Sequence, residues 1–444
     1  MEKGRHIPKV SFFDFLKRAL EIVKNPLPFH HDNFEEKGDT FQLHLGFGNR
    51  ILFSRNAAFL QYALQKNQRN YTKSRVQTRD VAKYIGKGLL TSEGEHWKKQ
   101  RKLIQPAFHK RHLAQLMGIM QETIKQELAV IPEGKKVNVE TIFGRLAFQV
   151  VAKSLFSGAV DEVAINRLQT IVEASQKMLV RELRQPYLGW WFKASGILDR
   201  HLAMVQEARE LIRALIVKRK ADGERKDDLL DMLLDARYED GTSMHVEQMI
   251  DEIMILFTAG HETTSNALSF TCQLLAKYPK YQERIYRENK QLEGQDLMAG
   301  LMSQKITRYV LEESMRLYPP AYFIDRMNHN ADEFQNMALK PKTPLLFSVI
   351  EIHRHGKYWE DPLEFLPERF EGPPNQHSDH YYPFGGGPRM CIGNNFAMFE
   401  MQMVISELIK DLKITPTTKT IEILPLITLR PKNAILEFEK RVPC

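Results

Sequence analysis

The sequence predicts a mainly α-helical protein with small β-sheets near both ends of the chain. Helical periodicity dominates from Asn56 to about Lys280. The preceding stretch TFQLHLGFGNRILFS reads as two strands joined at a Gly-Phe-Gly-Asn turn, and short strand-like runs such as TPLLFSVIEI follow Pro319. An amphipathic helix, FFDFLKRALEIVKN, is expected before the first strands, and a long helix after Gly393.

The longest predicted helix carries polar residues in its middle. It begins near Met244 and meets no proline before Pro279, so it should be roughly 50 Å long at about 1.5 Å per residue. Its centre, AGHETTS, combines a glycine and an acid with three hydroxyl residues. Such residues are poor helix formers, and Ser and Thr can bond back to helix carbonyls. A tolerated kink would explain one such residue, but the cluster favours function.

The composition is typical of a globular enzyme from a reducing compartment. The 444 residues are 43% hydrophobic and 27% charged, with only Cys272, Cys391 and Cys444 as cysteines, too few for a disulfide framework. Neither a signal peptide nor a run of about eighteen apolar residues is present. We therefore expect a cytoplasmic protein without a membrane anchor. The formal net charge of +8 is dispersed, which disfavours nucleic-acid binding and favours a local basic face for an acidic partner.

The segment FGGGPRMCIG places Cys391 in a glycine-rich loop before a predicted helix. A cysteine nucleophile would need a histidine base, and a zinc site would need several ligands at short spacing. Haem needs only one axial thiolate from the protein. Glycines allow the backbone to approach a porphyrin closely, and a helix N-terminus stabilises the thiolate. Arg389 lies two residues away and could pair with a haem propionate.

This loop resembles that of the cytochromes P-450, the haem-thiolate monooxygenases. The family motif has Phe, Gly, Arg, Cys and Gly at fixed spacing, and these positions are occupied here by Phe384, Gly387, Arg389, Cys391 and Gly393. The resemblance makes Cys391 the iron ligand and identifies the other four as cofactor-binding positions.

Two segments match the family's structural ion pairs. LEESMRLYPP places Glu313 and Arg316 three residues apart on one helical face, where they can pair. In the family this pair is buried and is joined by a second arginine, which corresponds to Arg369 of FLPERF.

Other segments match residues around the cofactor. The resemblance makes Glu262 and Thr263 of AGHETT the acid and alcohol that deliver protons. SEGEHWKKQR begins a helix with a predicted Ser92–Glu95 capping box and places Trp97 and Arg101 one turn apart. The resemblance assigns both to a haem propionate, together with Arg326.

The resemblance therefore implies one domain, residues 1–444, with the triangular, mainly helical fold of the family and no fused reductase. Haem b (iron protoporphyrin IX) would lie between the long distal helix and the Cys-loop helix, with dioxygen as co-substrate. A monomer is expected, with NAD(P)H supplying electrons indirectly through a reductase and a ferredoxin or flavodoxin. The neighbourhood of Trp97 is basic: Lys98, Lys99, Arg101, Lys102, Lys110 and Arg111. A solvated face would explain these charges alone, but the resemblance makes this helix the expected docking face, because the family's acidic partners dock there.

The implied reaction is hydroxylation or oxidative O-dealkylation of a small organic substrate. O-demethylation of a methylated sugar is a specific alternative, because polar residues accompany Trp190 and Trp191 near the expected pocket. Plain packing is the simpler explanation of these two tryptophans. A peroxide-driven peroxygenase, and a haem-based sensor or electron carrier, are further alternatives, which the Glu262–Thr263 pair disfavours.

Overall fold

A computed structural model describes residues 7–46, 48–157, 160–373 and 376–441. The chain divides into two compact units. The first unit comprises Met1–Ser74, Glu312–Cys391 and Ile423–Lys432, and the second comprises Arg75–Leu311, Ile392–Glu422 and Asn433–Cys444. Each unit is described here by itself.

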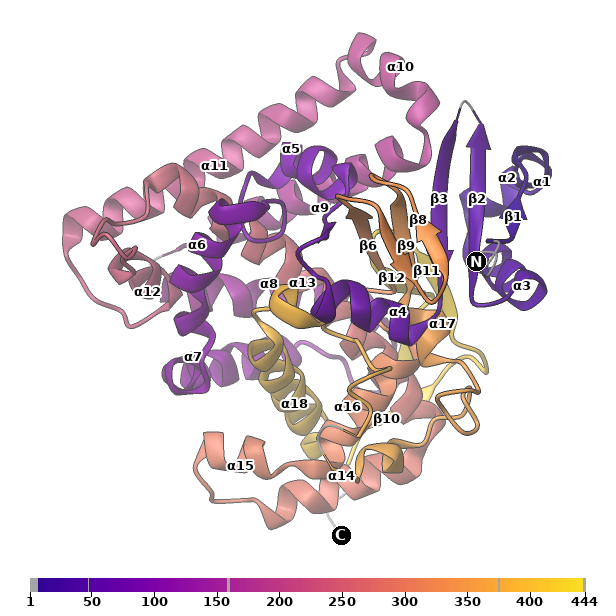
Figure 1. The fold of residues 1–444 in the computed structure, drawn as a ribbon. Helices are drawn as coiled ribbons and strands as arrows, with labels where there is room; N and C mark the ends of the chain where they lie inside the picture. The colour runs from indigo at the N-terminus through magenta and orange to yellow at the C-terminus, as the bar shows by residue number, and fades with distance from the viewer. Residues whose placement is uncertain (1–6, 47, 158–159, 374–375, 442–444) are drawn as a thin grey trace. The chain divides into compact units, whose positions relative to one another are not determined.

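The first unit is built on a six-stranded mixed sheet (Figure 1). Its order is β1 (Lys9–Val10), β2 (Thr40–Gly46), β3 (Asn49–Ser54), β9 (Pro344–Ser348), β6 (Phe323–Asn328) and β4 (Tyr71–Thr72). β2 and β3 pair antiparallel, as their sequence predicts, although Phe47 of the expected turn lies outside the described residues. β3 and β9 pair in parallel, so the sheet joins segments nearly 300 residues apart.

Two apolar clusters fill the first unit. One contains Phe41 and Phe53, whose rings stack at 5.3 Å, and the other surrounds Phe59 and Phe347. The remaining elements are α1 (Phe12–Lys17), α2 (Ala19–Lys24), α3 (Leu27–Lys37), α4 (Ala57–Gln61), the π-helix η1 (Tyr62–Lys66), the hairpin β7–β8 (Asp332–Phe334, Met337–Leu339), α17 (Val349–His353), the short 3-10 helices η6 (Pro367–Phe370) and η7 (Gly387–Arg389), and the pair β11–β12 (Glu422–Pro425, Leu429–Lys432).

The second unit is mainly helical. Its helices are the π-helix η2 (Val76–Val81), α5 (Ala82–Ile85), α6 (Gly94–Ile104), η3 (Gln105–Phe108), α7 (Lys110–Leu128), α8 (Val139–Phe156), α9 (Glu162–Arg184), η5 (Pro186–Leu188), α10 (Gly189–Ala194), α11 (Ile197–Asp222), α12 (Leu229–Asp235), α13 (Val246–Lys277), α14 (Pro279–Gln291), α15 (Leu297–Ser303) and α18 (Asn394–Asp411). α16 (Lys305–Leu317) begins in this unit and ends in the first. A three-stranded antiparallel sheet contains β10 (Leu412–Pro416), β13 (Ile435–Lys440) and β5 (Lys136–Asn138), with β13 in the middle.

α13 is the predicted long helix, and its 32 residues run through the second unit against α8 (Figure 1). Phe257 stacks on Phe148 of α8 at 4.9 Å, and His261 meets the edge of the same ring. The hydroxyls along α13 bond back as expected: Thr258 donates to Met254 and Thr263 to Ala259, at 2.8 and 2.7 Å. The helix therefore keeps these polar side chains satisfied without partners from other elements.

Two local predictions are wrong. FFDFLKRALEIVKN forms two short helices rather than one, because the backbone at Arg18 leaves the helical region with φ −105° and ψ 10°. There the guanidinium reaches Asp32 of α3 at 2.7 Å, a tertiary contact that local periodicity does not encode. TPLLFSVIEI is a strand only to Ser348, and α17 follows. Val349, Ile350, Ile352 and His353 are buried, a spacing that suits a helix rather than a strand.

Within the described residues, no helix combines the length and the apolar character needed to cross a bilayer.

Candidate functional site

The Cys391 loop is built by glycines in the first unit. Cys391 is exposed, and its amide donates to the carbonyl of Phe384 at 2.9 Å. Gly385 and Gly387 have φ values of +72° and +65°, the left-handed region that side chains disfavour. A Cβ on Gly387 would lie 1.9 Å from the carbonyl oxygen of Leu64, so η7 packs directly on the backbone of η1.

The donor set of this loop fits haem better than the other candidate centres. Among the described residues, no group of three or more His, Cys, Asp or Glu side chains is arranged to hold a metal ion. One exposed thiol in a tight backbone turn matches a cofactor that brings its own four nitrogen ligands. Residues that would hold this group are Cys391 as axial ligand and Arg326, Arg389, Trp97 and Arg101 as propionate contacts.

The predicted ion pair is present in the first unit. Arg316 donates to both carboxylate oxygens of Glu313, at 2.6 and 2.8 Å, and both side chains are fully buried. Nε of Arg369 forms an ion pair with Glu313 at 3.4 Å but no hydrogen bond to it, and Nη2 of Arg369 donates to the carbonyl of Asp361 at 2.7 Å. The second arginine is therefore an electrostatic neighbour of a pair that is already complete.

The predicted propionate residues are distributed over both units. Arg326 on β6 is 8% exposed in the first unit, where Arg389 ends η7. Trp97 and Arg101 belong to α6 in the second unit, with Trp97 buried. The capping box expected at Ser92 is wrong: Glu93 is the N-cap of α6 and makes no side-chain cap bond. The Ser92 hydroxyl donates instead to the carbonyl of Gly88 at 2.6 Å, because the preceding loop folds back on itself.

Glu262, Thr263 and Gly393 all lie in the second unit. Glu262 and Thr263 are partly buried in the centre of α13, one turn after Ala259, which is exposed in a largely buried helix. A small exposed residue gives a flat ligand room to approach the helix. The Cβ position of Gly260 is 3.1 Å from the side chain of Val151 on α8, so the two helices pack closely at this point. Gly393 is the N-cap of α18.

Sequence reasoning missed two adjacent acids that hold the loop before α6. The amide of Lys87 donates to Asp251 at 2.8 Å, and that of Leu89 donates to Glu252 at 3.0 Å. A Cβ on Gly86 or Gly88 would lie 2.1 or 2.5 Å from these carboxylates. Arg209 of α11 pairs with Asp251 as well. A Gly-Lys-Gly stretch was the available signal, but the acids lie more than 160 residues later.

Glu182 on α9 binds two side chains of α5. Tyr84 donates to Glu182 at 2.5 Å, and Lys83 reaches both of its carboxylate oxygens. Burial, followed by this carboxylate, raises the pKa of Tyr84. The hydroxyl therefore remains a donor and ties α5 to α9.

A buried acid on α18 was also missed. Glu400 is fully buried, and neither of its carboxylate oxygens has a hydrogen-bond partner within the protein. This burial raises the pKa of Glu400 well above its ordinary value and so favours the neutral carboxyl. The single acid in the apolar run FAMFEMQMVI was the available sequence signal.

The tryptophans of α10 do not form a packed core. Trp190 is 70% and Trp191 44% exposed, so the packing interpretation is wrong for Trp190 and incomplete for Trp191.

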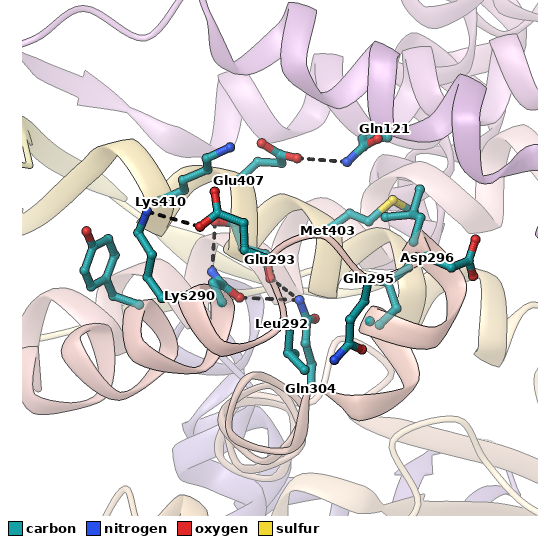
Figure 2. A pocket seen from close by; sticks show the side chains of 16 residues that line it. Gln121, Lys290, Leu292, Glu293, Gln295, Asp296, Gln304, Met403, Glu407 and Lys410 are labelled. Carbon is teal, nitrogen blue, oxygen red and sulfur yellow. Dashed lines mark hydrogen bonds and ion pairs between the residues drawn. The ribbon is translucent and has the colours of Figure 1, made fainter. Parts of the chain in front are cut away.

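A mixed-charge pocket elsewhere in the second unit lies between α14, α15 and α18 (Figure 2). Gln121 of α7 donates to Glu407 at its edge, at 3.1 Å. None of the predicted site residues lines this pocket.

Comparisons with known proteins agree with these features. Residues 8–438 match the family model described as Cytochrome P-450. A cytokinin hydroxylase from Arabidopsis thaliana is 28% identical over 93% of this chain and 83% of the relative. Cyclooctat-9-en-7-ol 5-monooxygenase from Streptomyces melanosporofaciens is 26% identical over 91% of this chain and 88% of the relative. The solved cytochrome P-450DA heme domain matches the fold with a TM-score of 0.89 at 22% identity, over 99% of this chain and 98% of that one. The expected fold class is confirmed.

Gly387→Ala should reduce the melting temperature and haem retention far more than Gly385→Ala. Gly385 has no other atom within 4 Å of its Cβ position, so alanine there costs only left-handed strain of about 1–2 kcal/mol. Alanine at 387 adds a backbone collision with Leu64. Thermal melts and haem absorbance of the two purified variants measure the difference. Equal losses would contradict the close packing of η7 on η1.

Proposed function

The chain belongs to the cytochrome P-450 family, and from this membership we propose that Cys391 is the axial thiolate ligand of its haem. The protein is a monooxygenase, an oxidoreductase with haem b as cofactor and dioxygen as co-substrate, and it receives electrons from NAD(P)H through a redox partner. When bound, the haem activates dioxygen for insertion of one oxygen atom into the substrate.

The exposed thiol in its glycine-built turn is the observation that carries this proposal. The Phe384 carbonyl fixes the Cys391 amide at 2.9 Å, and the backbone of η1 fixes Gly387. The thiol position is therefore set by backbone contacts rather than by mobile side chains. Such preorganisation suits a ligand whose distance to iron must be constant.

Cys391→Ser should abolish the thiolate-type absorbance of the reduced carbonyl complex, because an alcohol donates much less electron density to iron. Cys272→Ser is the matched control, since Cys272 is fully buried and burial raises the pKa of its thiol. Spectra of both reduced, carbon-monoxide-treated variants provide the test. Retention of the thiolate-type band in Cys391→Ser would refute the ligand assignment.

We also propose that Glu262 and Thr263 would deliver the protons that dioxygen activation requires. Both are partly buried on α13 next to the exposed Ala259. The Thr263 hydroxyl donates to its own helix at 2.7 Å, so its oxygen lone pairs can accept a bond from water or from a bound ligand. Glu262 places a carboxyl group one residue away.

Thr263→Ala should leave haem binding unchanged but reduce product formed per NAD(P)H consumed by about tenfold or more, since a positioned proton donor contributes 10²–10⁴ in rate. Thr258→Ala is the control, because Thr258 lies on the same helix and makes the same kind of back-bond at 2.8 Å. Product and peroxide are measured against NAD(P)H consumption. Unchanged coupling in Thr263→Ala, or equal loss in both variants, would contradict the relay.

The remaining predicted residues have supporting roles in this proposal. Trp97, Arg101, Arg326 and Arg389 bind propionates, Phe384 and Gly393 shape the cofactor loop, and Glu313, Arg316 and Arg369 maintain the first unit. Their contribution to one cofactor supports the expectation of a single functional domain over residues 1–444.

For the reaction, we favour hydroxylation of a small organic molecule over O-demethylation of a methylated sugar. The relatives described above are named as a hydroxylase and a monooxygenase. Peroxide-driven chemistry and a sensor or electron-carrier role have less support, because an acid and an alcohol are adjacent on α13. Three cysteines in 444 residues favour a cytoplasmic location.

We propose an acidic ferredoxin or flavodoxin, reduced by its NAD(P)H-dependent reductase, as electron donor to a monomeric enzyme. Lys98, Lys99 and Lys102 on α6, and Lys110 and Arg111 at the start of α7, are exposed. Lys98 pairs with Glu95 and Lys102 with Glu239. These pairs are exposed and therefore weak, so a carboxylate-rich partner can compete for the lysines.

The variant K98E/K99E should slow reduction by an acidic ferredoxin about tenfold or more at low ionic strength and flatten its salt dependence, because charged rims mainly set association rates. K218E/K220E on α11 is the matched control, with the same charge change at exposed lysines. Stopped-flow reduction at several salt concentrations measures both. Equal slowing in the two variants would indicate net charge rather than a docking face.

A further inference from the structure

Two histidines face each other in the segment between η6 and the Cys391 loop. Nδ1 of His377 lies 3.2 Å from Nε2 of His380. The backbone turns between them, with the amide of His380 donating to the carbonyl of His377 at 3.1 Å. Both residues belong to the first unit.

The outer nitrogens of both rings must carry hydrogen. Nε2 of His377 lies 3.0 Å from the carbonyl oxygen of Arg369, which can only accept. Nδ1 of His380 lies 2.6 Å from the carboxylate of Asp379, also an acceptor. In two neutral imidazoles, the facing nitrogens are therefore both lone pairs.

Two lone pairs at 3.2 Å repel each other unless a positive species lies between them. A proton can occupy that position, and so can a metal ion. Two nitrogen ligands at about 2.0–2.1 Å from a tetrahedral zinc ion lie roughly 3.4 Å apart, close to the observed separation. Hydrogen bonds from the outer nitrogens to a carbonyl and a carboxylate are also the arrangement typical of metal-bound histidines.

Aromatic rings hold both imidazoles in place. Trp359, which is 2% exposed, lies 4.6 Å from the His377 ring and 4.8 Å from the His380 ring. Tyr358 stacks on His380 at 5.6 Å. The side chain of His380 is 13% exposed and that of Asp379 is 68% exposed, so solvent reaches the pair next to Asp379.

We propose that His377 and His380 form a binding site for a divalent cation of the zinc class, independent of the haem. Imidazole favours zinc, copper and nickel over calcium or magnesium. No third protein ligand is arranged around the pair within the described residues, so we expect micromolar rather than structural-zinc affinity. The bound ion would hold the chain just before Tyr382 and Phe384. The amide of Tyr382 donates to His353 at 2.8 Å.

The test is isothermal titration of untagged holoenzyme with Zn²⁺ at pH 7.5. We expect one site that weakens more than tenfold in both His377→Gln and His380→Gln, with a zinc-dependent rise in melting temperature that these variants lose. H109Q/H112Q is the matched control, because His109 and His112 have the same spacing in the sequence. Absence of binding, or binding that only the control variant loses, would overturn the proposal.

Discussion

The backbone from α17 to η6, which precedes the thiol loop in the chain, depends on the guanidinium of Arg316. Besides Glu313, it donates to the carbonyls of His353, Pro362 and Glu364 at 2.7, 2.7 and 2.9 Å. A guanidinium is planar and its donors point in fixed directions, so one side chain fixes three backbone positions. Glu313 also accepts from the amide of Leu366 at 2.9 Å. The path from α17 to η6 is therefore determined before the chain reaches Cys391.

The buried Glu313–Arg316 ion pair stabilises the fold only when both charges and their hydrogen-bond partners are present. Burying two charges costs several kcal/mol per ion, and removing one partner of such a pair costs about 3–5 kcal/mol, because the other charge stays buried. Here three carbonyls accept bonds from Arg316, and the centre of the Trp359 ring lies 5.1 Å from the guanidinium carbon. The same indole packs against His377 and His380, so the ion pair and the proposed cation site both contact Trp359.

Local sequence patterns predicted the parts of the molecule that local forces determine. The α13 helix, the β2–β3 hairpin and the Glu313–Arg316 spacing follow from periodicity and from side-chain reach along one helix. The break at Arg18 did not, because Asp32 lies in another helix. Asp251, Glu252 and Glu182 hold loops that are about 100 or more residues away in sequence. The facing imidazoles depend on Trp359, which no nearby motif predicts.

In the proposed relay, the back-bonded hydroxyl of Thr263 has a consequence for the timing of proton delivery. Its single hydrogen is occupied by the carbonyl of Ala259 at 2.7 Å, whereas its lone pairs remain available. Thr263 can therefore receive a hydrogen bond without moving, but it can give one only after rotating away from the helix. In that relay, Thr263 therefore accepts a hydrogen bond in its back-bonded rotamer and donates one only after it rotates. The arriving ligand, rather than the protein, determines when the hydrogen of Thr263 changes partner.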